Sequence, residues 1–121
     1  MPQKIVVADG RKHVLEKATE ILVANGFEVV TVENGNQAKE QALGANADLI
    51  LADYLMPEKS GLGMVFDLRQ SGNKTPVLIM SESTLLNNDL IIKSGGNGFV
   101  KKPLESETLL TSIRSTLSKT P

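Results

Sequence analysis

The chain has 121 residues, no cysteine, and 13 basic against 14 acidic side chains, which give a net charge of −1 at pH 7. This length suits a single domain, and the lack of cysteine excludes disulfide frameworks, thiolate zinc sites and thiol catalysis. With 40% hydrophobic and 22% charged residues, the sequence has neither the composition of a disordered tail nor the basic excess of a surface that binds nucleic acid.

The first half of the chain alternates between short apolar runs and amphipathic segments. The runs Lys4–Ala8 and Phe27–Val32 are rich in β-branched residues and predict two strands. Between them, Lys12–Asn25 carries apolar residues at three-to-four spacing and is followed by a glycine, which predicts an amphipathic helix. A second helix is expected over Gly35–Leu43, where a glycine again follows.

The middle of the chain begins the same pattern again. The apolar run Leu49–Ala52 predicts a buried third strand that leads directly into Asp53. Ser60 is a suitable N-cap for a helix that ends at Gln70. We expect this helix to bury four apolar residues: Leu62, Val65, Phe66 and Leu68.

The last part of the chain adds two more strands and two more helices. The run Val77–Met80, followed by Ser81, predicts the fourth strand. A short helix is expected near Leu85–Lys93, and a fifth strand over Phe99–Lys101. The final helix is expected to bury Leu109, Leu110, Ile113 and Leu117.

This order of elements predicts an α/β fold. Parallel strands need crossover helices, and these crossovers are right-handed, so the alternation indicates a doubly wound five-stranded parallel sheet, (βα)5, with helices on both faces. A closed barrel would need about eight such units and about 250 residues. We expect one domain over residues 1–121, with its core at about 4–117.

Four polar side chains follow the strands at the edge where an open parallel sheet binds its ligands. Asp9 follows the first strand, Asp53 the third, Ser81 the fourth and Lys102 the fifth. Each alone is more easily explained as a turn former or a helix cap. Together they suggest a site, because two close carboxylates attract Mg²⁺ while an amine and a hydroxyl suit phosphoryl oxygens. The residues therefore indicate phosphoryl transfer onto a carboxylate, and Asp53 on the central strand is the better acceptor.

Three segments carry a resemblance to a known family. The segments DLILADYLMPEKSG, PVLIMS and GFVKKP are similar to the third, fourth and fifth strands of the receiver domains of two-component response regulators, the CheY-like family. The similarity covers the chain from Lys4 to about Leu117. It implies the flavodoxin-like strand order 2-1-3-4-5, which the alternation alone does not choose. It also implies a cis peptide bond between Lys102 and Pro103.

The resemblance implies a role for each residue that matches the family pattern. Asp53 would be the phosphoacceptor, Lys102 the lysine that accompanies it, and Ser81 the switch hydroxyl. Phe99 would occupy the aromatic switch position, without a hydroxyl.

The resemblance further implies a Mg²⁺ site formed by the carboxylates of Asp9 and Asp53 and the backbone carbonyl of Leu55. Receivers usually carry two adjacent acids after the first strand, and the second is normally the direct metal ligand. Here Gly10 stands at the second position, so we expect weaker binding of Mg²⁺.

Glu82 is a second departure, because the family usually has a small residue directly after the switch hydroxyl. Three interpretations are open. Glu82 repels the incoming phosphoryl group and, with Gly10, makes a receiver that works without phosphorylation. Alternatively, Glu82 reaches the metal as the missing carboxylate, or it points into solvent and only tunes rates.

The sequence thus predicts a response regulator receiver domain in two-component phosphorelay signalling. It would accept a phosphoryl group on Asp53 from a histidine kinase or a phosphotransfer protein, with at most self-catalysed phosphorylation and dephosphorylation rather than enzyme activity. A downstream protein partner is expected at the face formed by the fourth helix, fifth strand and fifth helix. The alternative is a pseudo-receiver, a protein-interaction module independent of phosphorylation, which Gly10, Glu82 and Phe99 favour.

The location of the protein follows from segments that the sequence lacks. No stretch approaches the roughly 18 apolar residues of a membrane span, and the residues after Met1 form no apolar targeting core. We expect a cytoplasmic protein with no membrane contact and no direct nucleic-acid partner.

Overall fold

The structure is a computed structural model that describes residues 2–119, in which five strands alternate with five helices. The strands are β1 (Lys4–Ala8), β2 (Glu28–Val32), β3 (Leu49–Asp53), β4 (Val77–Ser81) and β5 (Gly98–Lys101). The helices are α1 (Lys12–Ala24), α2 (Gly35–Leu43), α3 (Gly61–Gln70), α4 (Asn88–Lys93) and α5 (Ser106–Lys119). The predicted alternation is confirmed.

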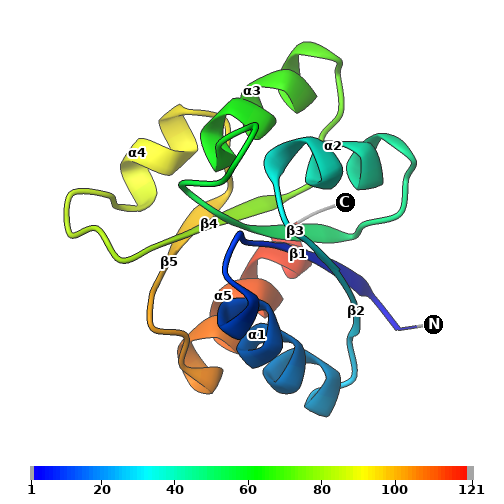
Figure 1. Ribbon diagram of the computed structural model, residues 1–121, viewed down its shortest axis with the longest axis vertical. Coiled ribbons are helices and arrows are strands. Elements are labelled where there is room, and N and C mark those ends of the chain that lie inside the picture. The colour runs from blue at the N-terminus through cyan, green and yellow to red at the C-terminus, as the bar shows by residue number, and fades with distance from the viewer. Residues whose placement is uncertain (1, 120–121) are drawn as a thin grey trace.

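The five strands form one parallel sheet in the order β2-β1-β3-β4-β5 (Figure 1). The strand order implied by the family resemblance is therefore confirmed. Every residue of β3 and of β4 is buried, as expected of strands that are covered on both faces. Because β3 is the middle strand, its last residue, Asp53, lies at the centre of the carboxyl edge of the sheet.

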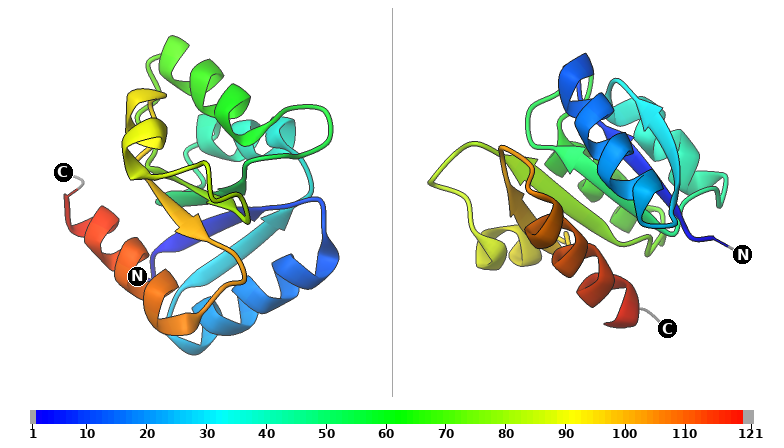
Figure 2. Two further views of the ribbon diagram at one scale, coloured as in Figure 1. Left: turned by 90° about the vertical axis from the view of Figure 1, so that its left-hand side faces the viewer. Right: turned by 90° about the horizontal axis from the view of Figure 1, so that it is seen from below.

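The helices cover the two faces of the sheet in two layers (Figures 1 and 2). Side chains alternate along a strand, so Ile5 and Val7 of β1 pack in the core beneath α1 and α5. Val6 and Ala8 pack in the second core, beneath α2, α3 and α4. Among the residues that the structure describes, no helix has the length and apolar character needed to cross a membrane.

Side-chain N-caps fix the start of three helices. Asn34, Ser60 and Asn87 each accept a hydrogen bond of 2.9–3.0 Å from the backbone N–H group three residues further on. The predicted N-cap Ser60 is confirmed. With Asn87 as its N-cap the fourth helix starts at Asn88, three residues after the predicted start near Leu85.

The apolar residues around α4 are more exposed than a packed helix would suggest. Ile91 is fully buried, but Leu85 is 82% exposed and Ile92 is 56% exposed. The physical reason is the shortness of α4, which has 6 residues and turns only a narrow stripe towards the sheet. Leu85 and Ile92 therefore lie on the surface rather than in the core.

One residue of α3 also differs from its prediction. The buried stripe of α3 consists of Gly61, Met64, Val65 and Leu68, at the three-to-four spacing of one helix face. Phe66 falls outside this stripe and is 60% exposed, so the prediction that it is buried is wrong.

Candidate functional site

The four side chains predicted from the strand ends meet at the carboxyl edge of the sheet. Asp9 follows β1, Asp53 ends β3, Ser81 ends β4, and Lys102 follows β5. They are 0%, 7%, 8% and 5% exposed, and with Asn34 they are the buried polar residues of the part of the chain that the structure describes. Burial of polar groups is costly unless they are paired, so this cluster marks the site.

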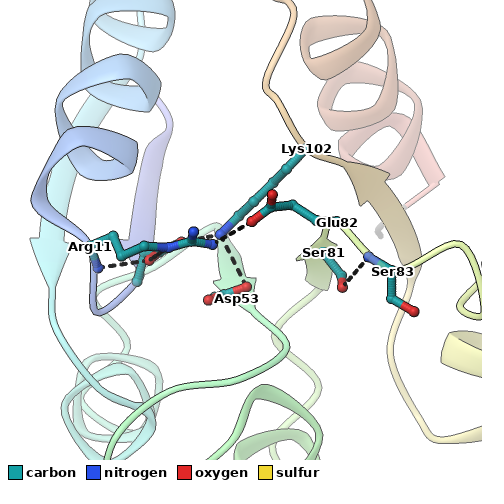
Figure 3. A network of polar contacts seen from close by, with 7 residues as sticks. Arg11, Asp53, Ser81, Glu82, Ser83 and Lys102 are labelled. Atoms are coloured by element: carbon teal, nitrogen blue, oxygen red, sulfur yellow. Dashed lines mark hydrogen bonds and ion pairs between the residues drawn. The ribbon is translucent and has the colours of Figure 1, made fainter.

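Lys102 joins the two carboxylates (Figure 3). Its Nζ lies 2.6 Å from Oδ2 of Asp9 and 3.1 Å from Oδ1 of Asp53. Its backbone N–H donates a hydrogen bond of 2.9 Å to the carbonyl oxygen of Ser81, which fixes the lysine to the end of the neighbouring strand. The Lys102–Pro103 peptide bond that follows is cis, as the family resemblance implied.

The environment of Asp53 favours a neutral carboxyl more than water does. Burial raises the pKa of Asp53, and the neighbouring Asp9 carboxylate raises it further, while the hydrogen bond and charge of Lys102 act in the opposite direction. Asp9 has partners on both oxygens, because Oδ1 accepts a hydrogen bond of 2.8 Å from the backbone N–H of Arg11. Asp53 thus has fewer hydrogen-bond and ion-pair partners than Asp9.

The loop after Asp53 is held close to the start of α3. Gly61 donates its N–H to the carbonyl oxygen of Tyr54 at 3.1 Å, and a Cβ atom at position 61 would overlap the carbonyl oxygen of Asp53. Only glycine fits this close approach. Leu55, whose carbonyl the family resemblance assigns to the metal, lies in this loop with 72% of its surface exposed.

Ser81 begins the loop after β4, and its hydroxyl is already engaged. Its Oγ accepts a hydrogen bond of 3.0 Å from the backbone N–H of Ser83 (Figure 3). Phe99 lies next to Ile79 across the β4–β5 pair and is half-buried against the core beneath α2, α3 and α4. Its N–H donates to Oδ1 of Asn88 at 2.8 Å, which ties β5 to the start of α4.

Glu82 forms an ion pair with Arg11 across the site. Nη2 of Arg11 donates to Oε1 of Glu82 at 2.9 Å, and Nε of Arg11 lies 3.9 Å from Oδ1 of Asp9. The hydrogen bond and charge of Arg11 lower the pKa of Glu82. Sequence reasoning did not assign Arg11 to the site. The available signal was a cation two residues after Asp9, at the edge where the other site residues lie.

The site offers Mg²⁺ fewer carboxylate ligands than a receiver domain usually does. Asp9 and Asp53 contribute two carboxylates, and Mg²⁺ typically takes one or two while keeping water in its other positions. Within residues 2–119, no three His, Cys, Asp or Glu side chains form a group that would hold a metal ion. Gly10 contributes no carboxylate, and a Cβ atom there would lie 3.2 Å from Cδ of Pro57.

Comparison with known proteins identifies the family. The response regulator receiver domain family matches residues 5–114 of the chain. The chain belongs to this family. Receiver domains act as phosphoacceptors in two-component signalling rather than as classical enzymes, they typically bind Mg²⁺, and they interact with histidine kinases and downstream partners.

Relatives of this receiver domain occur both alone and within longer proteins. The chemotaxis protein CheY of Bacillus subtilis is 30% identical over 123 residues, which cover 98% of this chain and 100% of CheY. The response regulator MprA of Mycolicibacterium vanbaalenii is 27% identical over 121 residues, which cover 99% of this chain and 52% of MprA. The chain therefore spans about half the length of MprA and the full length of CheY.

Solved structures support the same assignment. The receiver domain of the Francisella response regulator 1452 superimposes with a TM-score of 0.88 at 27% sequence identity, covering 98% of this chain and 99% of that one.

Proposed function

We propose that this receiver domain accepts a phosphoryl group on Asp53 from a phosphohistidine of a histidine kinase or a phosphotransfer protein. The observation that carries the proposal is the position of Asp53, a buried carboxylate at the centre of the carboxyl edge, 3.1 Å from the ammonium of Lys102. A carboxylate beside a fixed cation at this edge is suited to receive a phosphoryl group.

The transfer requires one bond to form and one to break. Because Oδ1 of Asp53 contacts Lys102, we assign Oδ2 as the attacking oxygen. The new bond joins this oxygen to phosphorus while the bond between phosphorus and the donor imidazole nitrogen breaks, and that nitrogen keeps the electron pair. Lys102 compensates the negative charge on the phosphoryl oxygens.

The acids of the site are of the kind that would hold a Mg²⁺ ion. The carboxylates of Asp9 and Asp53 and the backbone carbonyl of Leu55 would hold it, with a weaker grip than in a receiver that has an acid in place of Gly10. When bound, the ion supplies positive charge next to the phosphoryl oxygens.

Ser81 and Phe99 would convert phosphorylation into a change of surface. In this proposal the Ser81 hydroxyl exchanges the backbone of Ser83 for a phosphoryl oxygen, which draws the loop after β4 inward and repositions Phe99. The contacts support this coupling, because Ser81 begins that loop and Phe99 is tied through Asn88 to the start of α4. The phosphoryl group shifts the equilibrium between the two conformations only as far as its interaction free energy differs between them.

Two surfaces suit the two kinds of partner. A groove of about 580 Å³ opens beside the site between α1 and the segment after β5, and residues from both sides line it: Arg11, His13, Val14, Lys17, Pro103 and Leu104. We place the phosphohistidine donor there. We place the downstream partner over α4, β5 and α5, where Leu90 and Ile92 are 46% and 56% exposed.

We assign the receiver function to residues 4–117. We place the protein in the cytoplasm, where receiver domains usually work.

Mass spectrometry of the intact protein tests the assignment of Asp53. After treatment with acetyl phosphate and Mg²⁺, we expect the mass of one phosphoryl group on the wild-type protein and none on Asp53→Asn. Ser81→Ala provides a control that keeps the acceptor. Labelling of Asp53→Asn at the wild-type level would contradict the proposal.

One observation favours the pseudo-receiver as the second candidate. The Arg11–Glu82 ion pair and the Lys102 contacts already pair the charges of the site without a phosphoryl group. Such a module would give no mass increase with acetyl phosphate and would bind its partner equally well as wild type and as Asp53→Asn.

A further inference from the structure

Arg11 has an unusual position for a residue outside the expected site. It stands at the N-cap of α1 without capping the helix with its side chain, and its guanidinium is instead directed over the carboxyl edge of the sheet. In Figure 3, Arg11 and Glu82 approach each other from opposite sides, in the same polar network as Asp53 and Lys102. Arg11 thus belongs spatially to the phosphoacceptor cluster.

The stability of the fold does not explain this ion pair. The side chains of Arg11 and Glu82 are 48% and 63% exposed. Exposed pairs of this kind stabilise a protein little, because solvent screens them and two long side chains must be ordered. The pair joins positions 71 residues apart, from the loop after β1 to the loop after β4. Its position at the edge of the sheet that carries Asp9 and Asp53 therefore calls for another explanation.

The cluster has fewer cations than carboxylates, so a phosphoryl group on Asp53 would lack positive charge to compensate it. Three carboxylates, those of Asp9, Asp53 and Glu82, are in contact with two cations, Lys102 and Arg11. Lys102 is already divided between Asp9 and Asp53. A phosphoryl group brings a charge of about −1.5 to −2 at pH 7 in place of one carboxylate. Arg11 is the second cation of the cluster, and an exposed carboxylate holds it.

The chemistry of the guanidinium matches that need. Arginine presents five N–H donors in a planar fork that fits two phosphoryl oxygens at once. Nε of Arg11 is 3.9 Å from Oδ1 of Asp9, on the side of the cluster where Lys102 joins the two acids.

We propose that Arg11 is a phosphate-binding residue of this receiver domain and that Glu82 is its competing counter-ion. A phosphoryl group on Asp53 takes the guanidinium from Glu82, and Glu82, directly after Ser81, is then free to move with the loop that follows β4. This inference rests on the proposed phosphorylation of Asp53. It gives Glu82 a role that depends on Arg11, through competition for the guanidinium.

The test compares variants whose effects have opposite signs. Beryllofluoride, which mimics a phosphoryl group on a carboxylate, is titrated at a fixed Mg²⁺ concentration, and backbone amide NMR shifts give its dissociation constant. For Arg11→Gln we expect binding weakened about tenfold, the size of a lost charge-assisted hydrogen bond. For Glu82→Gln we expect binding strengthened several-fold, because the guanidinium is free.

Two further variants separate the effect of a lost positive charge from the effect of the guanidinium geometry. Lys12→Gln removes the adjacent exposed cation of α1 and is expected to leave the affinity within twofold of wild type. Arg11→Lys keeps the charge without the planar fork and is expected to fall between wild type and Arg11→Gln.

Two results would overturn the inference while leaving the proposed function intact. One is labelling of Asp53 by acetyl phosphate together with equal beryllofluoride affinity in wild type and Arg11→Gln. The other is equal weakening by Arg11→Gln and Glu82→Gln, which would show that the pair only holds the two loops together. If the wild-type protein takes no phosphoryl group on Asp53 and binds no beryllofluoride, the proposed function and the inference both fail.

Discussion

The ammonium of Lys102 lies 2.6 Å from the Oδ2 atom of Asp9, although the two residues are 93 positions apart in the chain. Lys102 follows the edge strand β5, and to reach Asp9 after β1 it extends past the carboxyl ends of β4 and β3. This single side chain therefore connects the ends of the first and last strands of the sequence next to Asp53, the proposed phosphoacceptor.

Lys102→Met is expected to destabilise the fold strongly. The substitution keeps the aliphatic bulk but removes the cation at 2.6 Å from the fully buried Asp9, which keeps only the more distant Arg11 at 3.9 Å. Removing one partner of a buried pair costs about 3–5 kcal/mol. Urea unfolding at pH 7 measures the change, and Lys101→Met, at the exposed neighbouring position, is the control, expected to change stability by less than about 0.5 kcal/mol. Equal unfolding midpoints for the two variants would contradict the assigned pair.

Asp53→Asn is expected to stabilise the protein at neutral pH. The pKa of Asp53 is raised by burial and by Asp9, so the folded state binds the Asp53 proton more tightly than the unfolded state does. The free energy of unfolding of the wild type therefore falls as pH rises from about 4, the ordinary range of an aspartate, through the raised pKa. Asparagine lacks this titration. The difference in the free energy of unfolding between Asp53→Asn and wild type should thus be absent at low pH and reach a plateau above the raised pKa. Urea unfolding at a series of pH values measures it.

A constant difference between Asp53→Asn and wild type at every pH would indicate a packing effect rather than ionisation. Lys102 remains paired with Asp9 in the variant, so the comparison isolates the carboxyl group of Asp53.

Gly10→Asp is expected to strengthen Mg²⁺ binding about tenfold, because cation affinity rises with the number of carboxylate ligands. The new Cβ atom would lie 3.2 Å from Cδ of Pro57, so this ring must shift by a few tenths of an ångström. The chain has a single tyrosine and no tryptophan. Since that tyrosine is Tyr54, next to Asp53, intrinsic fluorescence can follow the titration. Gly10→Asn matches the size without the charge, and an equal gain in affinity for both variants would refute the electrostatic explanation.

The sequence predicted the fold and the four buried site residues for a physical reason. Strands covered on both faces read as continuous apolar runs, and the polar residue that ends each run must lie at the carboxyl edge. Asp53 and Lys102 were found in this way. The strand order required the family resemblance, because alternation alone is compatible with several orders.

Contacts between distant loops carried no such signal. The Arg11–Glu82 pair depends on the relative placement of two loops that only the folded sheet brings together. The start of α4 was misplaced because Leu85 and Leu86 extend the apolar pattern of the helix, whereas the side-chain cap of Asn87 sets the boundary. A local hydrogen bond prevailed over hydrophobic pattern.

Alanine substitutions before and after the start of α4 should differ sharply in their effect on the free energy of unfolding. Ile91 is fully buried, so Ile91→Ala is expected to cost about 2–5 kcal/mol in the free energy of unfolding. Leu85 is 82% exposed, and Leu85→Ala should change stability by less than about 0.5 kcal/mol. Thermal and urea unfolding measure both. A large loss for Leu85→Ala would mean that this segment packs as a helix after all.

Arg69 organises the opposite end of the sheet through loop backbone. Its guanidinium donates hydrogen bonds to the carbonyl oxygens of Gly95, Asn73 and Thr75 at 2.9, 3.1 and 3.0 Å, and to Oδ1 of Asn97 at 3.2 Å. These contacts join the end of α3 to the turn between α4 and β5. Three of the four acceptors are main-chain atoms, which explains why no side-chain pattern in the sequence indicates this role.

Arg69→Met is expected to lower the free energy of unfolding by about 3 kcal/mol, because it keeps the aliphatic packing and removes every donor from these loop acceptors. Arg69→Lys should lose less, since an ammonium retains the charge but cannot span several acceptors in one plane. Arg114→Met, at an exposed position of α5, provides the surface control. Hydrogen exchange adds a local readout. In Arg69→Met the amides near Gly95 should exchange faster than those of β1, whereas uniform acceleration would show that Arg69 contributes to global stability alone.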